Sequence, residues 1–71
     1  MSEQSKQYQP HQQRVVDEKT ELDAKLDKLV AFFEMPMFKT IQIEEQMRLA
    51  KQCEYMSLYS QVLGDRIDAF N

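Results

Sequence analysis

Several of the residues that organise small proteins are scarce in this 71-residue chain, which has one cysteine, one glycine, two prolines and no tryptophan. A single cysteine excludes an intrachain disulfide, and no cysteine and histidine cluster is present that would form a structural metal site. One glycine is too few for a phosphate-cradling loop. A chain of this size buries only about 60% of its unfolded surface. Its stability must therefore come from efficient helix packing or from self-association.

Excess positive charge and long apolar runs are absent too. The formal net charge is −3 and the isoelectric point is about 5.0, which argues against binding to a nucleic-acid polymer or to an anionic membrane. The longest apolar run, Leu29–Phe33, is far shorter than the roughly 20 residues that span a bilayer. Residues 1–9 contain no apolar segment of the kind found in signal peptides. We expect a cytoplasmic protein.

The spacing of apolar residues predicts a first helix over about residues 10–34. The positions that share one helical face are Val15, Leu22, Leu26, Leu29 and Phe33. Pro10 suits the first turn of a helix, and Pro36 disfavours helical geometry at the residue before it. The polar residues 1–9 are expected to form a flexible tail.

A connector over residues 35–43 and a second helix over about residues 44–70 are expected next. Thr40 is the candidate N-cap of that helix. Three apolar residues of the connector are expected to cover the end of the hairpin: Met37, Phe38 and Ile41. Two helices joined by a short connector predict an all-α, antiparallel two-helix hairpin.

The second helix carries more apolar surface than one partner helix can cover. One stripe consists of Leu49, Cys53, Met56, Leu63, Ile67 and Phe70, and the other consists of Met47, Tyr55, Leu58 and Val62. Packing against a single helix needs one stripe about 100° wide. We therefore predict assembly into a helical-bundle homo-oligomer, with the second stripe as its interface or as a surface for another partner. The alternative is that these are scattered surface residues.

No catalytic motif is present. The sequence lacks the Walker, dinucleotide-binding, HExxH and CxxC patterns, and its one histidine, His11, lies next to the expected tail. Adjacent acids such as Asp17 and Glu18 point about 100° apart on a helix, which does not suit an acid/base pair. We expect a protein that is not an enzyme and that holds no cofactor or metal.

The hairpin register instead suggests a binding site. If the connector is centred near residue 38, residues whose numbers sum to about 77–81 face each other. The residues expected to meet near the open end are Arg14, Lys19, Tyr59 and Arg66. Guanidinium groups hold phosphates and aromatic rings stack on bases, so this set suits a nucleotide. Alternatively, the arginines pair with nearby acids, and Lys19 extends past the core with its charge in solvent.

The chain also resembles a recurring phage and prophage pattern. The resemblance is carried by Arg14, Val15, Glu18, Glu21, Leu22, Leu26, Leu29, Phe33, Phe38, Tyr59, Leu63, Arg66 and Ile67. It covers about residues 10–70 and is similar to the crAss-phage-related small helical-hairpin family. The sequence departs from that pattern at residues 41–44, where Ile-Gln-Ile-Glu replaces a Leu-Pro-Glu-Glu helix start. The resemblance implies a phage origin and a binding role.

Three functions follow as hypotheses. Small phage proteins without catalytic motifs include oligomeric sponges that counter host defence by sequestering a cyclic-nucleotide immune messenger, which would be a cyclic oligonucleotide or a related nucleotide. The alternative is a protein–protein inhibitor or adaptor that docks the second apolar stripe onto a host defence protein. Mimicry of DNA ranks last, because twelve acids against nine bases is a mild surplus.

Overall fold

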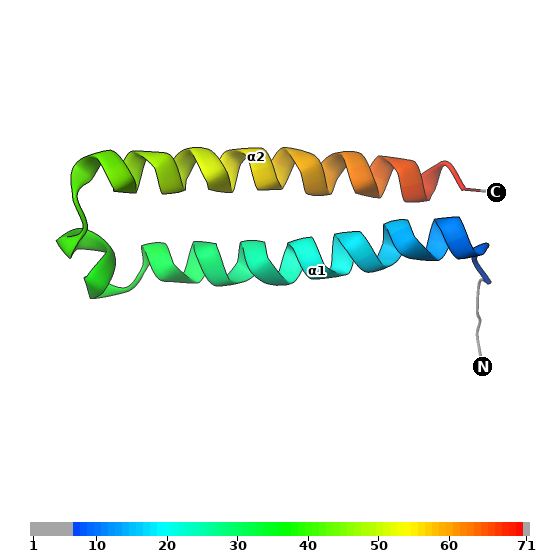
Figure 1. Ribbon diagram of the computed structural model, residues 1–71, viewed down its shortest axis with the longest axis horizontal. Helices are drawn as coiled ribbons and strands as arrows, with labels where there is room; N and C mark the ends of the chain where they lie inside the picture. The colour runs from blue at the N-terminus through cyan, green and yellow to red at the C-terminus, as the bar shows by residue number, and fades with distance from the viewer. Residues whose placement is uncertain (1–6, 71) are drawn as a thin grey trace.

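The computed structural model describes residues 7–70. The all-α antiparallel hairpin is confirmed: α1 and α2 lie side by side, joined by a short 3-10 helix, and the described residues contain no strand (Figure 1). The first turns of α1 lie beside the last turns of α2. Assembly into an oligomer stays a prediction.

The first helix, α1, spans Pro10–Phe33. Proline at its first position loses no hydrogen bond, since the first amides of a helix have no partner within it. The backbone amide of Gln9 donates to Oε1 of Gln12 at 2.9 Å, which holds the entry to the helix.

The expected flexible tail falls into two parts. Residues 1–6 lie outside the described residues. Tyr8, in contrast, packs edge-on against Phe70 with ring centroids 5.9 Å apart, so this part of the expected tail contacts the end of the hairpin. Edge-to-face aromatic pairs of this kind stabilise a fold by about 0.5–1.5 kcal/mol beyond simple burial.

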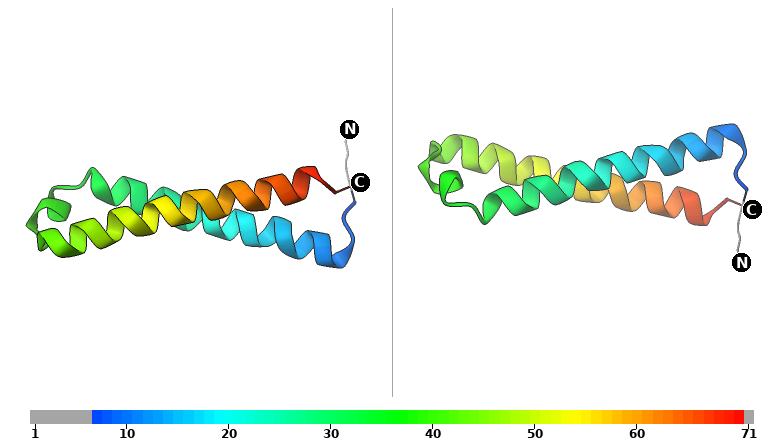
Figure 2. Two further views of the ribbon diagram at one scale, coloured as in Figure 1. Left: turned by 90° about the horizontal axis from the view of Figure 1, so that it is seen from above. Right: turned by 90° about the horizontal axis from the view of Figure 1, so that it is seen from below.

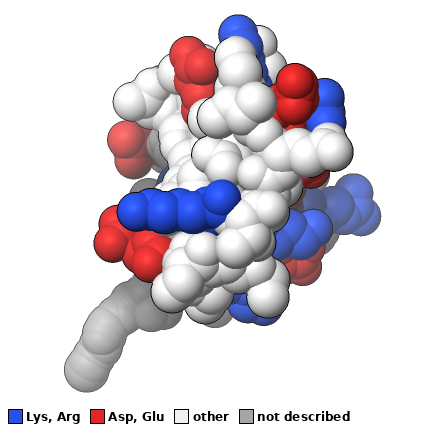
Figure 3. Space-filling model, turned by 90° about the vertical axis from the view of Figure 1, so that its left-hand side faces the viewer, with Lys and Arg blue, Asp and Glu red and all other residues white. Residues whose placement is uncertain are grey.

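The connector contains a 3-10 helix, η1, over Pro36–Thr40. Phe38 of η1 packs edge-on against Phe32 and Phe33, with ring centroids 5.9 and 5.0 Å apart. Met37 is 65% exposed, so of these two connector residues it is Phe38 that covers the end of the helices. Uncharged side chains form most of the surface at this end of the molecule, and a basic side chain lies across part of it (Figure 3).

The second helix, α2, spans Ile43–Asp68, and its N-cap is Gln42. The expectation that Thr40 caps it is wrong, because the Thr40 hydroxyl donates to the Met37 carbonyl at 2.7 Å and closes the 3-10 turn. The side-chain amide of Gln46 donates to the Ile41 carbonyl at 2.9 Å and ties the start of α2 to the connector.

The core between the helices is thin. Among the described residues the buried hydrophobic side chains are Val15 of α1 and Leu63 of α2, and Leu63 is 0% exposed. The two helices cross obliquely (Figure 2), and most apolar positions along them are only half-buried. Full burial of a leucine contributes about 1.5–3 kcal/mol. A core this small leaves a single copy with little margin of stability.

Candidate functional site

Lys19, one of the expected ligand-binding residues, is part of a polar cluster between the helices. Its ammonium group donates to Oδ2 of Asp23 at 2.7 Å and to the hydroxyl of Ser60 at 3.1 Å. The Ser60 hydroxyl donates in turn to Oδ1 of Asp23. Ser60 is buried at 8% exposure, and these bonds satisfy it. Lys19 therefore faces Ser60 and not Tyr59, and its charge is already partnered.

The polar cluster affects the protonation of Asp23. The hydrogen bond from Lys19, followed by that from Ser60, lowers the pKa of Asp23 below its ordinary value. Desolvation opposes this shift and the charge of Lys19 adds to it. Asp23 stays ionised and completes the cluster as its acceptor.

Gly64 makes room for this cluster. A Cβ atom built on Gly64 would lie 3.3 Å from Cε of Lys19, so the lysine stem crosses α2 where the chain has its one glycine. Glycine inside a helix costs about 1 kcal/mol relative to alanine. The close approach of the lysine explains why it is tolerated here.

The two arginines expected in the site, Arg14 and Arg66, are exposed. Neither forms an ion pair with any side chain in the described part of the chain, so the alternative that they are neutralised by neighbouring acids is not what the structure has. They lie on helix ends that are neighbours in the hairpin, but within residues 7–70 no hydrogen bond or ion pair joins them to Lys19 or Tyr59.

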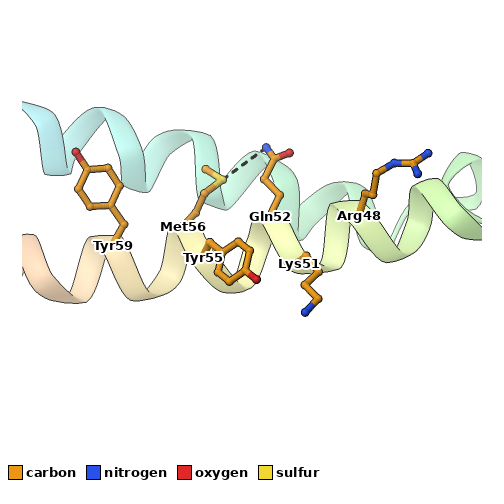
Figure 4. Close-up of a pocket in the computed structure, with 6 residues that line it drawn as sticks. All are labelled: Arg48, Lys51, Gln52, Tyr55, Met56 and Tyr59. Carbon is orange, nitrogen blue, oxygen red and sulfur yellow. Dashed lines mark hydrogen bonds between the residues drawn. The ribbon is translucent and has the colours of Figure 1, made fainter.

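A shallow groove of about 410 Å³ lies on α2, away from the polar cluster (Figure 4). It is lined by Arg48, Lys51, Gln52, Tyr55, Met56 and Tyr59. These residues recur at helical spacing and occupy one side of the helix. Two of the six are cations, two are aromatic and none is acidic, while the walls are almost entirely apolar.

The charged groups of the groove are only loosely engaged. Nε of Arg48 lies 2.7 Å from Oε1 of Glu45, but the two side chains are 69% and 45% exposed, so this pair is weak and can be exchanged. Nζ of Lys51 lies 5.9 Å from the centre of the Tyr55 ring, within cation–π range. The groove therefore offers cationic donors beside aromatic faces.

Arg66 belongs to the same side of α2. It follows Tyr59 by seven residues, which is close to two helical turns. We call the side of α2 that carries Arg48, Tyr55, Tyr59 and Arg66 the groove face. Two of the residues predicted to bind ligand, Tyr59 and Arg66, thus share a face, whereas Lys19 lies in the polar cluster.

The second apolar stripe shares Tyr55 with the groove face and is open to solvent. Its members are exposed by 63% at Met47, 60% at Tyr55, 52% at Leu58 and 53% at Val62. Packing against α1 leaves each of them more than half exposed. Their role as an oligomer or partner interface stays a prediction.

Sequence reasoning missed the groove residues Arg48, Lys51, Gln52 and Met56. The signal was available, because residues 48, 52, 55 and 59 are spaced by four, three and four, as one helix face requires. The hairpin register pairs Tyr59 with residues of α1, whereas the neighbours that line the groove with Tyr59 lie along its own helix.

The described residues contain neither a group of metal-binding side chains nor a helix that could cross a membrane. Within residues 7–70 no three His, Cys, Asp or Glu side chains are grouped to hold a metal ion. Over the same part of the chain neither helix combines the length and apolar character that crossing a membrane requires.

Comparison with protein families gives a match over most of the chain. The model of a family described as Sequestin matches residues 9–69, which include both helices and the connector. Neither a curated protein nor a solved structure matches the chain. The family name indicates a sequestering, binding role. It does not refer to the crAss-phage-related proteins, so the phage origin that the resemblance implies stays a prediction.

Proposed function

The chain belongs to the Sequestin family, and we propose that it is a non-enzymatic binding protein that sequesters a small nucleotide-class ligand. The observation that supports this most directly is the groove of α2. Its volume of about 410 Å³ is within the range of small-molecule sites, and it combines two tyrosines with Arg48 and Lys51. Tyrosine rings stack on bases, and the two cations pair with phosphates.

The groove is a better candidate site than the open end of the hairpin. Lys19 already has two partners there, and drawing it away would break its ion pair with Asp23 and the hydrogen bond that it donates to the buried Ser60 hydroxyl. Tyr59 and Arg66 remain in the proposed site, because both lie on the groove face. Of the four residues expected to bind ligand, Arg14 is the one that lies at the open end of the hairpin and belongs neither to the groove face nor to the polar cluster.

The biological role that fits such a binder is counter-defence. We propose a phage-encoded, homo-oligomeric sponge that works in the host cytoplasm and withdraws a cyclic-nucleotide immune messenger from its receptor. The family name and the resemblance to phage hairpin proteins support this role. Sequestration requires that the ligand is bound and not altered.

Titration calorimetry with a panel of cyclic di- and trinucleotides, and with AMP as a linear control, tests the proposal. We expect binding of at least one cyclic member, weakened about 5- to 150-fold by Tyr55→Ala, because loss of one stacked base costs about 1–3 kcal/mol. The matched control is Arg14→Ala, which should bind like the unaltered protein. Ligand recovered by denaturing the complex should be chemically intact on chromatography.

Two results would overturn this assignment. One is the absence of heat with every nucleotide while circular dichroism shows a folded chain. The other is normal binding by Tyr55→Ala together with loss of binding by Arg14→Ala, which would return the site to the open end of the hairpin. A cleaved ligand would show that the protein is an enzyme.

A second candidate function has its own observation. The exposed apolar stripe of Met47, Leu58 and Val62 suits docking into a groove of a host protein, as an inhibitor or adaptor would do. The double variant Tyr55→Ala, Leu58→Ala, if folded, should then lose capture of that host protein. Retained capture would count against the adaptor.

A further inference from the structure

We propose that two copies of the chain pair antiparallel through their groove faces, about a two-fold axis level with Ser57, and that the partner's Arg66 completes each groove. The pairing follows from the layout of α2. The anion placed between the copies rests on the function proposed above.

The groove face has the same order of residue types in both directions. Arg48 precedes Tyr55 by seven residues, four residues separate Tyr55 from Tyr59, and Arg66 follows Tyr59 by seven. Seven residues are close to two helical turns, so all four side chains remain on one side. The order Arg, Tyr, Tyr, Arg is therefore unchanged when the helix is reversed.

A two-fold antiparallel pairing makes use of this symmetry. Such an axis brings the same surface of both copies together in opposite directions. Tyr55 then packs against the partner's Tyr59, and Arg48 comes next to the partner's Arg66. Both contacts occur twice, once on each side of the axis.

The small core of the hairpin and the exposed apolar residues of α2 favour a second copy of the chain as the partner that covers the groove face. The buried hydrophobic side chains within residues 7–70 are Val15 and Leu63, while Tyr55 and Tyr59 remain 60% and 45% exposed. Val62, on the neighbouring part of the helix, is 53% exposed. A self-pairing covers all of these on both copies at once and supplies the burial that a single hairpin lacks.

The positive charges of Arg48 and of the partner's Arg66 call for an anion between the two copies. Between Arg48 and Arg66 the acids of α2 are Glu54 and Asp65, and each lies about 100° or more around the helix from the groove face. Glu45 contacts Arg48 only at Nε, which leaves the terminal nitrogens of the guanidinium open. Two facing guanidinium groups repel each other unless an anion is bound between them.

A phosphate group is the anion that two guanidinium groups bind best, since each offers a planar pair of donors. The dimer then has two equivalent phosphate sites, each beside a Tyr55–Tyr59 contact that can take a base. The ligand class is a nucleotide whose phosphate bridges the two copies. Ligand binding and dimer formation are consequently coupled.

Charge reversal tests the pairing without any nucleotide. In Arg66→Glu, the introduced carboxylate faces the partner's Arg48 at both ends, and we expect the dimer dissociation constant to fall about tenfold. In Arg48→Glu with Arg66→Glu, carboxylates face each other, and we expect it to rise about tenfold above that of the unaltered protein. Lys28→Glu, which makes the same change on the exposed surface of α1, is the control and should change nothing. Analytical ultracentrifugation over a concentration series measures all four proteins.

Inorganic pyrophosphate is the probe for the bridging anion. It should tighten the dimer of the unaltered protein and leave Arg66→Glu unaffected. The pairing is overturned if Arg66→Glu weakens the dimer, leaves it unchanged or remains monomeric. If the charge reversals behave as expected and no nucleotide binds in calorimetry, the pairing stands and the proposed function fails. If a nucleotide binds and the charge-reversal pattern is absent, the proposed function stands and the pairing fails.

Discussion

Ser60 and Tyr59 are consecutive residues of α2, yet they belong to opposite regions of the molecule. Ser60 is 8% exposed and bonded to Lys19 and Asp23, whereas Tyr59 is 45% exposed in the groove. The Ser60 side of the hairpin is internally satisfied, with its charges paired. The groove face has exposed rings and cations that are loosely paired or not paired at all within residues 7–70. One side of α2 holds the fold together, and the other is available for binding.

The difference between the two sides of α2 predicts that the largest loss of stability follows substitution of Leu63, which lies between the helices. Leu63→Ala removes a fully buried side chain and should lower the free energy of unfolding by about 2–5 kcal/mol. Val30→Ala is the control, because Val30 is 47% exposed and should cost far less. Urea denaturation followed by circular dichroism measures both. Equal losses would show that the two sites are equally buried in solution.

The polar cluster predicts a smaller effect that depends on pH. The folded pKa of Asp23 is lowered, so its contribution to stability is present above its unfolded pKa of about 4 and is lost as the pH falls through the folded value. Asp23→Asn should therefore be less stable than the unaltered protein at neutral pH, with the gap narrowing below about pH 4.

Asp27→Asn is the matched control for this measurement. Asp27 lies one turn further along α1 and is exposed, and its side chain makes no hydrogen bond or ion pair with another described residue. Its variant should match the unaltered protein in stability at neutral pH. A gap for Asp23→Asn that stays constant down to pH 2 would contradict the role given to its carboxylate.

The smallest effect concerns the packing of Lys19 over Gly64. Gly64→Ala gains about 1 kcal/mol of helix propensity, and the new Cβ, 3.3 Å from Cε of Lys19, offsets it by pressing on a side chain held at its far end. The net change should be close to zero. In a Lys19→Ala background the same substitution should stabilise by about 1 kcal/mol. A double-mutant cycle by thermal denaturation measures this coupling, and an additive result would show that the two residues do not touch.

The fold could be predicted from the sequence because it depends on local signals. Pro10 and Pro36 mark the start and the end of the first helix, and the spacing from Val15 to Phe33 fixes its buried face. The cap of α2 could not be predicted in the same way. The Thr40 hydroxyl could either cap α2 or bond to the connector backbone. It bonds to the Met37 carbonyl because the connector forms a 3-10 turn, and that turn depends on where Phe38 packs.

The candidate site was only partly predictable, for a different reason. A shift of a single residue in register turns a helix by about 100°, which separates Ser60 from Tyr59. Sequence reasoning placed Lys19 near residue 59 along the hairpin but could not resolve which of the two neighbours it contacts. The exposure of Tyr55, Leu58 and Val62 followed directly from the surplus of apolar positions on α2, since α1 covers one stripe.

The antiparallel arrangement of α1 and α2 has a consequence for the electric field of the molecule. Each helix has a partial positive charge at its first turn and a partial negative charge at its last, and here the first turn of one lies beside the last turn of the other (Figure 1). The two macrodipoles largely cancel at both ends of the hairpin. Any attraction for an anion must then come from side chains, in an otherwise acidic protein with a net charge of −3. Such attraction acts over a screening length of about 8 Å at physiological salt, so capture of a charged ligand depends on local arginines and responds strongly to ionic strength.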